Sequence, residues 1–198
     1  FESSKFIHIM HSTFQYQKNP NFPNRYISPK SLQNFLQENL SDYITLIGTS
    51  TLGEPIYQFS YGSGDIKVLA WSQMHGNESN STHCMLDLWY SLESQPQLKE
   101  KLFQNISLDF ISMLNPDGSK VWSRRNSLDI DMNRDYLQNA SCEMKLLKEV
   151  AFSKKYDYAL NLHEQRTIFS TDGKNPATLS FLAPSEDYDR TVTENSKK

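Results

Sequence analysis

The chain has 198 residues, of which 37% are hydrophobic and 12% aromatic, and its 20 basic and 23 acidic side chains leave a net charge of −3. The apolar content excludes an intrinsically disordered chain, and the charge balance excludes a polybasic nucleic-acid binder. No apolar run approaches the ~20 residues that span a bilayer, so we expect neither a nucleic acid nor a membrane as a partner. At this length we expect a single domain over residues 1–198.

The sequence says little about the cellular compartment. Its two cysteines, Cys84 and Cys142, lie too far apart for a CxxC-type thiolate zinc site and cannot form a disulfide framework. The first residue is Phe1, and neither a signal peptide nor a transmembrane segment is recognisable, which slightly favours a cytoplasmic location. No pattern indicates the oligomeric state.

The first predicted elements are a helix and three strands. Ser28-Pro29 predicts a helix N-cap followed by proline at the first helical position, and residues 31–40 carry an apolar stripe with helical spacing. Strands are predicted after this helix, at residues 43–47, 56–61 and 66–71. The last two strands flank a Gly-Ser-Gly-Asp turn, which predicts a β-hairpin.

The later predicted elements alternate between helix and strand. The apolar spacing predicts a helix after residue 79, a strand over 108–114, a helix over 143–152, and strands over 158–162 and 178–182. Asn115-Pro116-Asp117-Gly118 is a turn signal that ends the strand over 108–114. This alternation predicts the α/β class.

Two histidines and a glutamate stand at predicted strand ends. His75 and Glu78 follow the strand over 66–71, and His163 follows the strand over 158–162. Because ligands collect at the carboxyl ends of strands in α/β sheets, the three side chains can face one ion. Two imidazoles and a carboxylate suit a catalytic zinc ion that keeps a position open for water. Either motif alone occurs by chance in many chains, whereas the two together are more specific.

An arginine-rich stretch lies between these two motifs. Residues 123–136 read Ser-Arg-Arg-Asn-Ser-Leu-Asp-Ile-Asp-Met-Asn-Arg-Asp-Tyr, so two arginine clusters surround alternating acids. Arginine with asparagine can clamp a carboxylate, and an arginine beside a polarised carbonyl can stabilise an oxyanion. Taken alone, such a stretch is more often a solvated loop.

Five motifs in this order resemble those of zinc carboxypeptidases of the carboxypeptidase A family. They are His75-x-x-Glu78, Asn115-Pro116-Asp117-Gly118, Arg125-Asn126, Asp131-Met132-Asn133-Arg134 and Asn161-Leu162-His163. The resemblance covers residues 30–185 and is greatest to short bacterial members. It implies a mixed, mostly parallel central sheet flanked by helices, here without its last strands. It also implies hydrolysis of C-terminal peptide bonds by metal-activated water, with peptides or C-terminal amino acids as partners.

The resemblance implies a role for each matching residue. One Zn²⁺ ion per chain would be held by three ligands, His75, Glu78 and His163. Asp131 would orient a ligand histidine by accepting its other ring N–H. Arg125 would polarise the scissile carbonyl, with Arg124 as the alternative because adjacent arginines blur the match. Asn133 and Arg134 would hold the terminal carboxylate of the substrate.

The resemblance also implies that one catalytic group is missing. The family's general-base glutamate and most of its specificity pocket lie well downstream of the third ligand, where this sequence has only 35 residues. Glu164 follows His163 in an extended segment, so its side chain should point to the opposite face. We therefore expect a C-terminal truncation and a chain that binds zinc but hydrolyses peptides poorly or not at all. A shortened sheet would also expose a strand edge and favour association.

Two alternative functions remain open. The His-Gly-Asn-Glu phrase and a similar Asn-Arg pair also resemble zinc-dependent N-acyl amino acid amidohydrolases, such as aspartoacylase and succinylglutamate desuccinylase. The short gap from Glu78 to His163 favours this alternative, whereas the Asn-Pro-Asp-Gly turn and the Arg125-Asn126 phrase favour a peptidase. The second alternative is a non-catalytic zinc- or peptide-binding module that has lost its general base.

Overall fold

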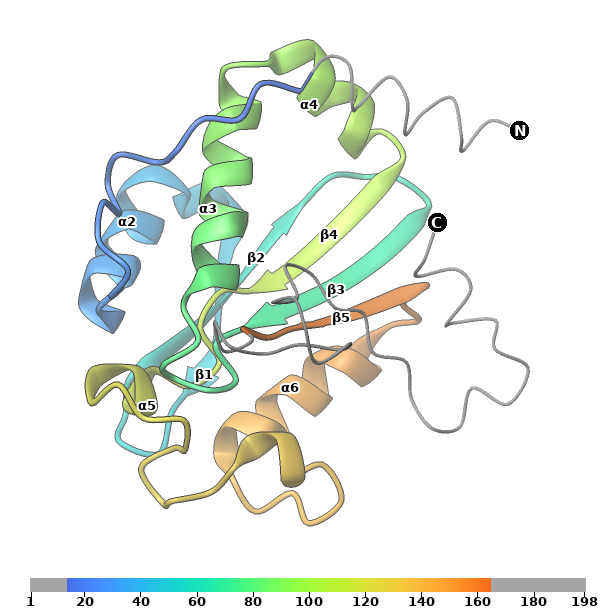
Figure 1. Ribbon diagram of the computed structural model, residues 1–198. Helices are drawn as coiled ribbons and strands as arrows, with labels where there is room; N and C mark the ends of the chain where they lie inside the picture. The colour runs from blue at the N-terminus through green and yellow to red at the C-terminus, as the bar shows by residue number, and fades with distance from the viewer. Residues whose placement is uncertain (1–13, 165–198) are drawn as a thin grey trace, which may run out of the picture. The chain divides into compact units, whose positions relative to one another are not determined.

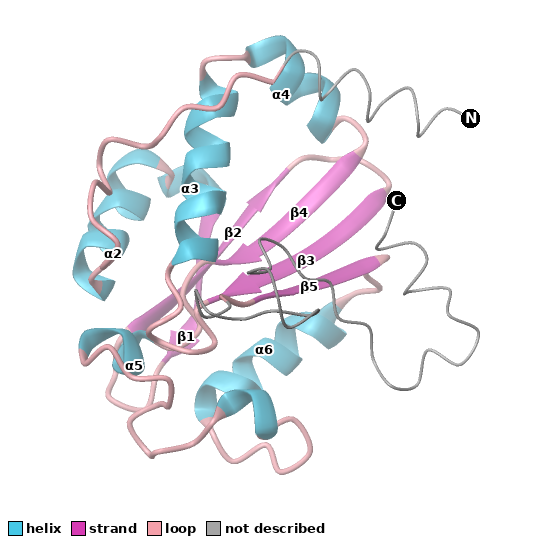
Figure 2. Ribbon diagram, in the orientation of Figure 1, coloured by secondary structure: helices cyan, strands magenta, loops and turns pink. Residues whose placement is uncertain are grey.

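A computed structural model describes residues 14–164, which form a five-stranded mixed sheet with helices on both faces (Figures 1 and 2). The strands are β1 (Ile44–Thr49), β2 (Pro55–Tyr61), β3 (Ile66–Ser72), β4 (Ile106–Ile111) and β5 (Tyr158–Leu162). The α-helices are α2 (Pro29–Asn39), α3 (Asn80–Glu93), α4 (Pro96–Phe103), α5 (Pro116–Lys120) and α6 (Cys142–Ser153). Short 3₁₀ turns occur at η1 (Ser41–Tyr43) and η2 (Met132–Arg134). The predicted α/β class and mixed sheet are confirmed.

The strand order of the sheet is β1-β2-β4-β3-β5. β2 pairs antiparallel with both β1 and β4, whereas β3 pairs in parallel with both β4 and β5. The parallel part of the sheet therefore consists of β4, β3 and β5. Because these strands run in the same direction, their carboxyl ends lie on one edge of the sheet, where ligands commonly bind in such folds.

The predicted β-hairpin over 56–61 and 66–71 is wrong, because β4 lies between β2 and β3 in the sheet. The connecting segment passes over the junction between α4 and β4. Ser63 N donates to the Phe103 carbonyl at the end of α4, and Ile66 N, at the start of β3, donates to the Asn105 carbonyl just before β4, both at 3.1 Å. A Cβ on Gly64 would come within 1.9 Å of the Asn105 carbonyl carbon. The glycine that suggested a tight turn is therefore needed for a close backbone approach.

Two apolar cores lie on opposite faces of the sheet. One packs α2, α3 and α4 against the strands, with buried side chains that include Leu36, Phe59, Leu86, Trp89 and Phe110. The other packs α6 against the strands, with Ile56, Leu69, Ile111, Met144 and Leu147 among its buried members. Burying one such side chain contributes about 1.5–3 kcal/mol of transfer free energy. The two cores therefore fix the sheet from both sides.

Most predicted elements are present, with shifted ends. Ser28 caps α2 as predicted, because its hydroxyl accepts a hydrogen bond from Ser31 N at 3.0 Å. The predicted turn at residues 115–118 is instead the start of α5, with the Asn115 side chain accepting from Gly118 N at 2.8 Å. Helix α4 was not predicted. The strand predicted at 178–182 lies outside the described residues. Among residues 14–164, no helix has both the length and the apolar character of a membrane span.

Candidate metal centre

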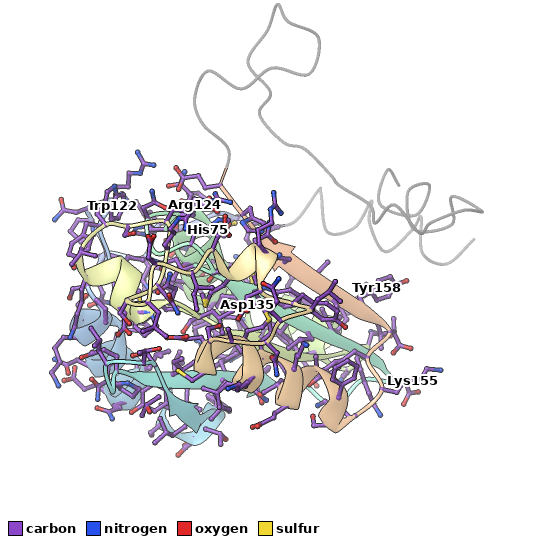
Figure 3. All side chains as sticks on the ribbon, turned by 90° about the horizontal axis from the view of Figure 1, so that it is seen from below. His75, Trp122, Arg124, Asp135, Lys155 and Tyr158 are labelled. Atoms are coloured by element: carbon purple, nitrogen blue, oxygen red, sulfur yellow. The ribbon has the colours of Figure 1, made fainter. Side chains whose placement is uncertain are left out.

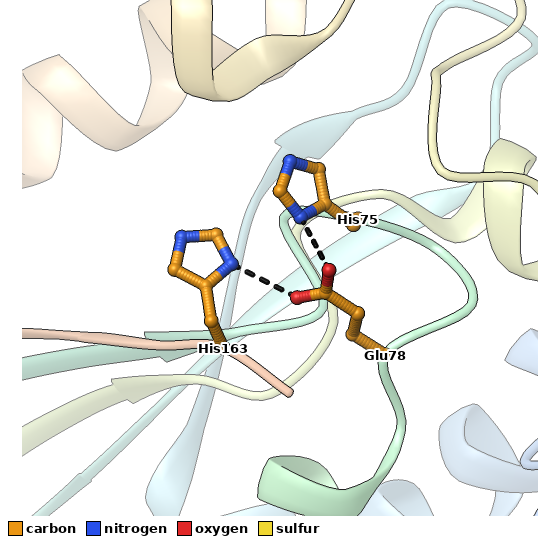
Figure 4. A group of neighbouring side chains, drawn as sticks. All are labelled: His75, Glu78 and His163. Carbon is orange, nitrogen blue, oxygen red and sulfur yellow. Dashed lines mark hydrogen bonds and ion pairs between the residues drawn. The ribbon is translucent and has the colours of Figure 1, made fainter. Parts of the chain in front are cut away.

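The three predicted metal ligands lie together at the carboxyl ends of two adjacent strands (Figure 4). Ser72 and Leu162 are paired residues at the ends of β3 and β5. His75 follows β3 after a short loop, and His163 follows β5 directly, so parallel pairing brings the two histidines to the same edge. Glu78 lies between β3 and α3 and reaches both imidazoles.

Hydrogen bonds join the Glu78 carboxylate to both histidines. Glu78 Oε1 lies 2.8 Å from His75 Nδ1, and Glu78 Oε2 lies 2.9 Å from His163 Nδ1. The three potential ligand atoms all lie within 4.8 Å of one another. His75 is 1% exposed, whereas the His163 side chain is 31% exposed, so the group is anchored on one side and open to solvent on the other.

The donor set fits a zinc ion. Two nitrogen ligands and one oxygen ligand, with one side open, are the composition of a catalytic zinc site. In addition, His75 Nε2 lies 3.1 Å from Asp131 Oδ1, so each ring nitrogen of His75 faces a carboxylate. An imidazole with one proton can donate to only one of these carboxylates. A cation between His75 Nδ1 and Glu78 would satisfy the remaining contact, and carboxylate–histidine–metal arrangements of this kind are common.

Glu78 is held in its ionised form. Burial alone would raise its pKa, but the hydrogen bonds from His163, His75 and the Glu164 backbone N–H outweigh burial and lower the pKa to about 2. The Glu164 N–H donates to Glu78 Oε2 at 3.1 Å. Glu78 is therefore a carboxylate at any physiological pH, which is the form that binds a cation.

Of the two adjacent arginines, Arg124 is the one that reaches the metal group, which consists of His75, Glu78 and His163. Its Nη1 donates to Glu78 Oε1 at 3.3 Å, and its Nε donates to Asp131 Oδ2 at 3.1 Å. Figure 3 shows Arg124 beside His75. The guanidinium of Arg125 points elsewhere, because its Nη1 donates to the Asp129 carbonyl at 2.8 Å.

Arg125 and Arg134 line an open cleft of about 410 Å³. Asp131, which contacts His75 of the metal group, also lines this cleft. The other side chains around this cleft are Asp129, Ile130, Asp135 and Gln138. Within residues 14–164, the Arg134 guanidinium forms no ion pair, and its one hydrogen bond goes to the Asn133 carbonyl at 3.5 Å. Asn133 itself lies in η2, which Asp131 caps through the Asn133 N–H at 3.1 Å. The cleft therefore has a guanidinium available for an anionic group.

Buried carboxylates hold the irregular segment that carries these arginines, a role that the sequence analysis did not assign to them. Asp117 accepts from Ser127 Oγ at 2.9 Å, Glu143 accepts from Asn126 Nδ2 at 3.2 Å, and Asp135 accepts from Ser141 N at 2.8 Å. All three acids are almost completely buried. A buried acid that accepts several local hydrogen bonds fixes the backbone around it, since leaving it unpaired is costly. The sequence places each of these acids at the start of a helix or in a turn, and this position is its only indication of such a role.

The Asn115-Pro116-Asp117-Gly118 motif supports the loop that carries His75. Asn115 Nδ2 donates to the Met74 carbonyl at 3.3 Å, and Asn115 N donates to the Gln73 carbonyl at 3.0 Å. A Cβ on Gly76 would come within 2.2 Å of the Gly118 carbonyl carbon. The motif therefore lets two backbone segments pack closely and presents His75 at the sheet edge.

The chain is similar to zinc carboxypeptidases over most of its length. The family profile described as zinc carboxypeptidase matches residues 30–191. Carboxypeptidase 2 of Trichophyton rubrum is 29% identical over 100 residues, which are 50% of this chain and 19% of that protein. A metallo-carboxypeptidase from Burkholderia cenocepacia superposes with a TM-score of 0.60 at 20% identity, over 71% of this chain and 42% of that chain.

A second solved structure extends this likeness. The metallo-carboxypeptidase of Pseudomonas aeruginosa, in complex with (2-guanidinoethylmercapto)succinic acid, superposes with a TM-score of 0.60 at 19% identity, over 71% of this chain and 40% of that chain. At these identities the structural likeness shows the shared fold. The matched part of the chain spans less than half the length of each of these relatives, so their substrates and partners do not transfer to it directly.

Proposed function

Because the chain belongs to the zinc carboxypeptidase family of peptide hydrolases, we propose that its His75–Glu78–His163 group binds one Zn²⁺ ion and serves the hydrolysis of C-terminal peptide bonds. The convergence of the three ligand atoms within 4.8 Å at the carboxyl edge of the sheet is the observation that carries this proposal. When bound there, zinc would polarise the scissile carbonyl and lower the pKa of a water molecule.

The residues around the ligands would orient and stabilise the reacting groups. Asp131 accepts a hydrogen bond at His75 Nε2, which fixes the ring orientation and makes His75 a better ligand. Arg124 stands beside Glu78 with a guanidinium that is half exposed, so it can donate to the oxygen that gains negative charge. We therefore assign the carbonyl-polarising role to Arg124 rather than to Arg125.

The cleft beside the metal group would select the free carboxylate of the substrate. Arg134 lines this cleft with a guanidinium that has no ion-pair partner among residues 14–164, and Asn133 precedes it. A bidentate arginine suits a terminal carboxylate better than a lysine does. This recognition would make the enzyme an exopeptidase.

A second candidate function is binding without efficient hydrolysis. Within residues 14–164, three carboxylates at or beside the proposed ligands already have partners. Glu78 contacts both histidines, Asp131 contacts His75 and Arg124, and Glu164 pairs with Arg25. None of these three is the unpaired carboxylate that would be expected of a general base. This observation supports a chain that binds zinc and peptide ends but turns substrate over slowly.

The first experiment measures bound metal in the purified, zinc-equilibrated chain. We expect about one zinc ion per chain, and its loss in both His75→Ala and His163→Ala, because two remaining protein ligands are too few for a stable site. His11→Ala, which changes a histidine that neither motif includes, serves as the control and should keep its zinc. A folded chain without metal, or a metal content that survives both substitutions, would contradict the proposal.

Activity assays on the zinc-loaded chain then separate the candidate functions. Release of a C-terminal amino acid from a peptide supports the carboxypeptidase, and release of an acyl group from an N-acyl amino acid would support the amidohydrolase. Zinc binding with no hydrolysis of either substrate, together with saturable binding of a peptide that has a free C-terminus, would support the binding module.

A further inference from the structure

Arg25, in the segment before α2, contacts both of the separate chain segments that carry the metal group. Its side chain forms an ion pair with Glu164, the residue that follows His163. Its backbone carbonyl accepts a hydrogen bond from Ser79 Oγ at 2.7 Å, and Ser79 directly follows Glu78. The same carbonyl lies 3.0 Å from His83 Nε2 on α3. One residue, distant in sequence from every ligand, thus connects the Glu78 loop to the end of β5.

The end of β5 has few other contacts to hold it, because the strand has one neighbouring strand within residues 14–164. Within residues 14–164, β5 is the last strand of the sheet and pairs only with β3. Its first four residues are all exposed to solvent. Three contacts hold the chain beyond Leu162. The Glu164 N–H donates to Glu78, and Ser81 Oγ donates to the His163 carbonyl at 3.2 Å. The Glu164 side chain pairs with Arg25. A misplacement of this end moves His163 relative to Glu78.

The Arg25 side chain, which is 60% exposed, has an aromatic contact in addition to the ion pair with Glu164. Its guanidinium carbon lies 5.6 Å from the Trp122 ring centroid, and the Trp122 ring packs edge-on against Tyr26 with a centroid separation of 5.7 Å. The Glu164 side chain is only 12% exposed, and its second oxygen also accepts from the Asn80 backbone N–H at 3.4 Å. An ammonium group can replace only part of the contacts of a guanidinium that stacks on an aromatic ring and pairs with a carboxylate.

We propose that Arg25 is a positioning residue of the metal centre, which sets the placement of His163 relative to Glu78 and thereby the zinc affinity of the chain. This inference rests on the proposed function, since it assumes that the group binds zinc. An exposed ion pair contributes little to the free energy of unfolding. Groups that hold metal ligands in place, in contrast, typically change metal affinity by about 10- to 100-fold when they are removed. Arg25 should therefore affect zinc binding far more than stability.

The test measures the zinc dissociation constant by competition with a chromogenic chelator, together with the thermal unfolding of the metal-free chain. We expect Arg25→Ala to bind zinc about 10- to 100-fold more weakly than the wild type. Arg25→Lys should recover part of this loss, because it keeps the charge but loses the planar fork. Glu164→Gln should weaken binding to a similar extent, and the double variant Arg25→Ala/Glu164→Gln should be no worse than either single change.

Lys120→Ala is the matched control, because Lys120 also forms a partly exposed ion pair, with Glu54, away from the metal group. It should leave the zinc affinity unchanged. If the wild type binds zinc and both Arg25→Ala and Glu164→Gln bind it equally well, the positioning role is overturned while the proposed function stands. The role is also overturned if weaker binding in Arg25→Ala is matched by a loss of thermal stability that Arg25→Lys and Glu164→Gln share. A wild-type chain that binds no zinc overturns the proposed function itself.

Discussion

Arg124 and Arg125 are adjacent in the chain, but their guanidinium groups have different surroundings. Arg124 contacts Glu78, a proposed zinc ligand, and Asp131, the carboxylate beside His75 Nε2. Arg125 contacts Asp129, whose side chain is almost fully exposed. Only the first arrangement puts a positive charge beside the atoms where an oxyanion would form.

We predict that Arg124→Gln weakens the binding of a phosphonate peptide analogue to the zinc-loaded chain by about 10²-fold, because one preorganised donor to an oxyanion contributes an effect of that order. Arg125→Gln should change the affinity much less. Isothermal titration of both variants with the same analogue checks this, and the zinc affinity of each is measured beside it so that metal loss is not mistaken for a lost contact. The reverse ranking would return the carbonyl-polarising role to Arg125.

The sequence was informative about those residues of the candidate site that directly follow a strand, because the end of a strand determines where they lie. His75 and His163 follow strands whose apolar runs are easy to recognise. Parallel pairing of these strands then brings the two histidines to the same end of the sheet. Sequence spacing could not distinguish Arg124 from Arg125, because the segment that carries them has no regular period. Arg25 could not be predicted at all, since its contacts with Ser79 and Glu164 arise only from tertiary packing.

At the scale of the elements, the strands could be predicted but their order could not. The strands β2 and β3 flank a glycine-containing turn that is typical of hairpins, yet β4 separates them. Insertion of β4 is favoured by its apolar side chains, since Phe110 faces one core and Ile111 the other. A local turn signal does not contain this information, because it depends on a segment about forty residues later. Helix α4 was not predicted because it is short and mixes charged and apolar residues.

Asp109 on β4 shows how the end of α6 is attached to the sheet. It is almost completely buried, and it accepts hydrogen bonds from Ser60 Oγ at 2.7 Å and Tyr156 Oη at 2.6 Å. Lys154, just after α6, forms an ion pair with it at 2.6 Å. Burial alone would raise the pKa of Asp109, but the contacts with Lys154, Tyr156 and Ser60 outweigh burial and hold the pKa below its ordinary value of 3.8.

A carboxyl group with a lowered pKa stabilises the folded chain above its unfolded-state pKa, and this contribution is lost as the pH falls through the folded-state pKa. We therefore predict that Asp109→Asn lowers the free energy of unfolding by about 2–3 kcal/mol at pH 7. The difference from the wild type should shrink below about pH 4. Denaturant titrations at several pH values check this. Asp129→Asn, at an exposed ion pair, is the control with little expected change. A difference that stays constant down to pH 3 would contradict an electrostatic role.

At the scale of the whole described unit, the candidate metal centre lies at the carboxyl ends of β3 and β5, and β5 is also the outermost strand on its side of the sheet within residues 14–164. β5 carries His163 at its end, and its outer edge faces no further strand within residues 14–164. Two large apolar side chains on this strand, Tyr158 and Leu160, are 55% and 45% exposed. Unpaired backbone groups beside exposed apolar side chains favour pairing with another chain. Strand β5 therefore has a candidate metal ligand at its end and, within residues 14–164, exposed apolar side chains along an unpaired edge.

We predict that the purified chain associates at high concentration through β5 and that Leu160→Lys reduces this association, because a charged side chain on an edge strand opposes strand pairing. Sedimentation equilibrium over a range of concentrations measures the effect as a change in the apparent mass. Leu52→Lys introduces the same charge at an exposed leucine in the turn between β1 and β2, and it should leave the association unchanged. A wild-type chain that stays monomeric throughout, or an equal effect of the two lysines, would show that the β5 edge is not the contact. Zinc content measured in the same samples tests whether association and metal binding at β5 are linked. Pairing at β5 that displaces His163 should lower zinc occupancy as the apparent mass rises.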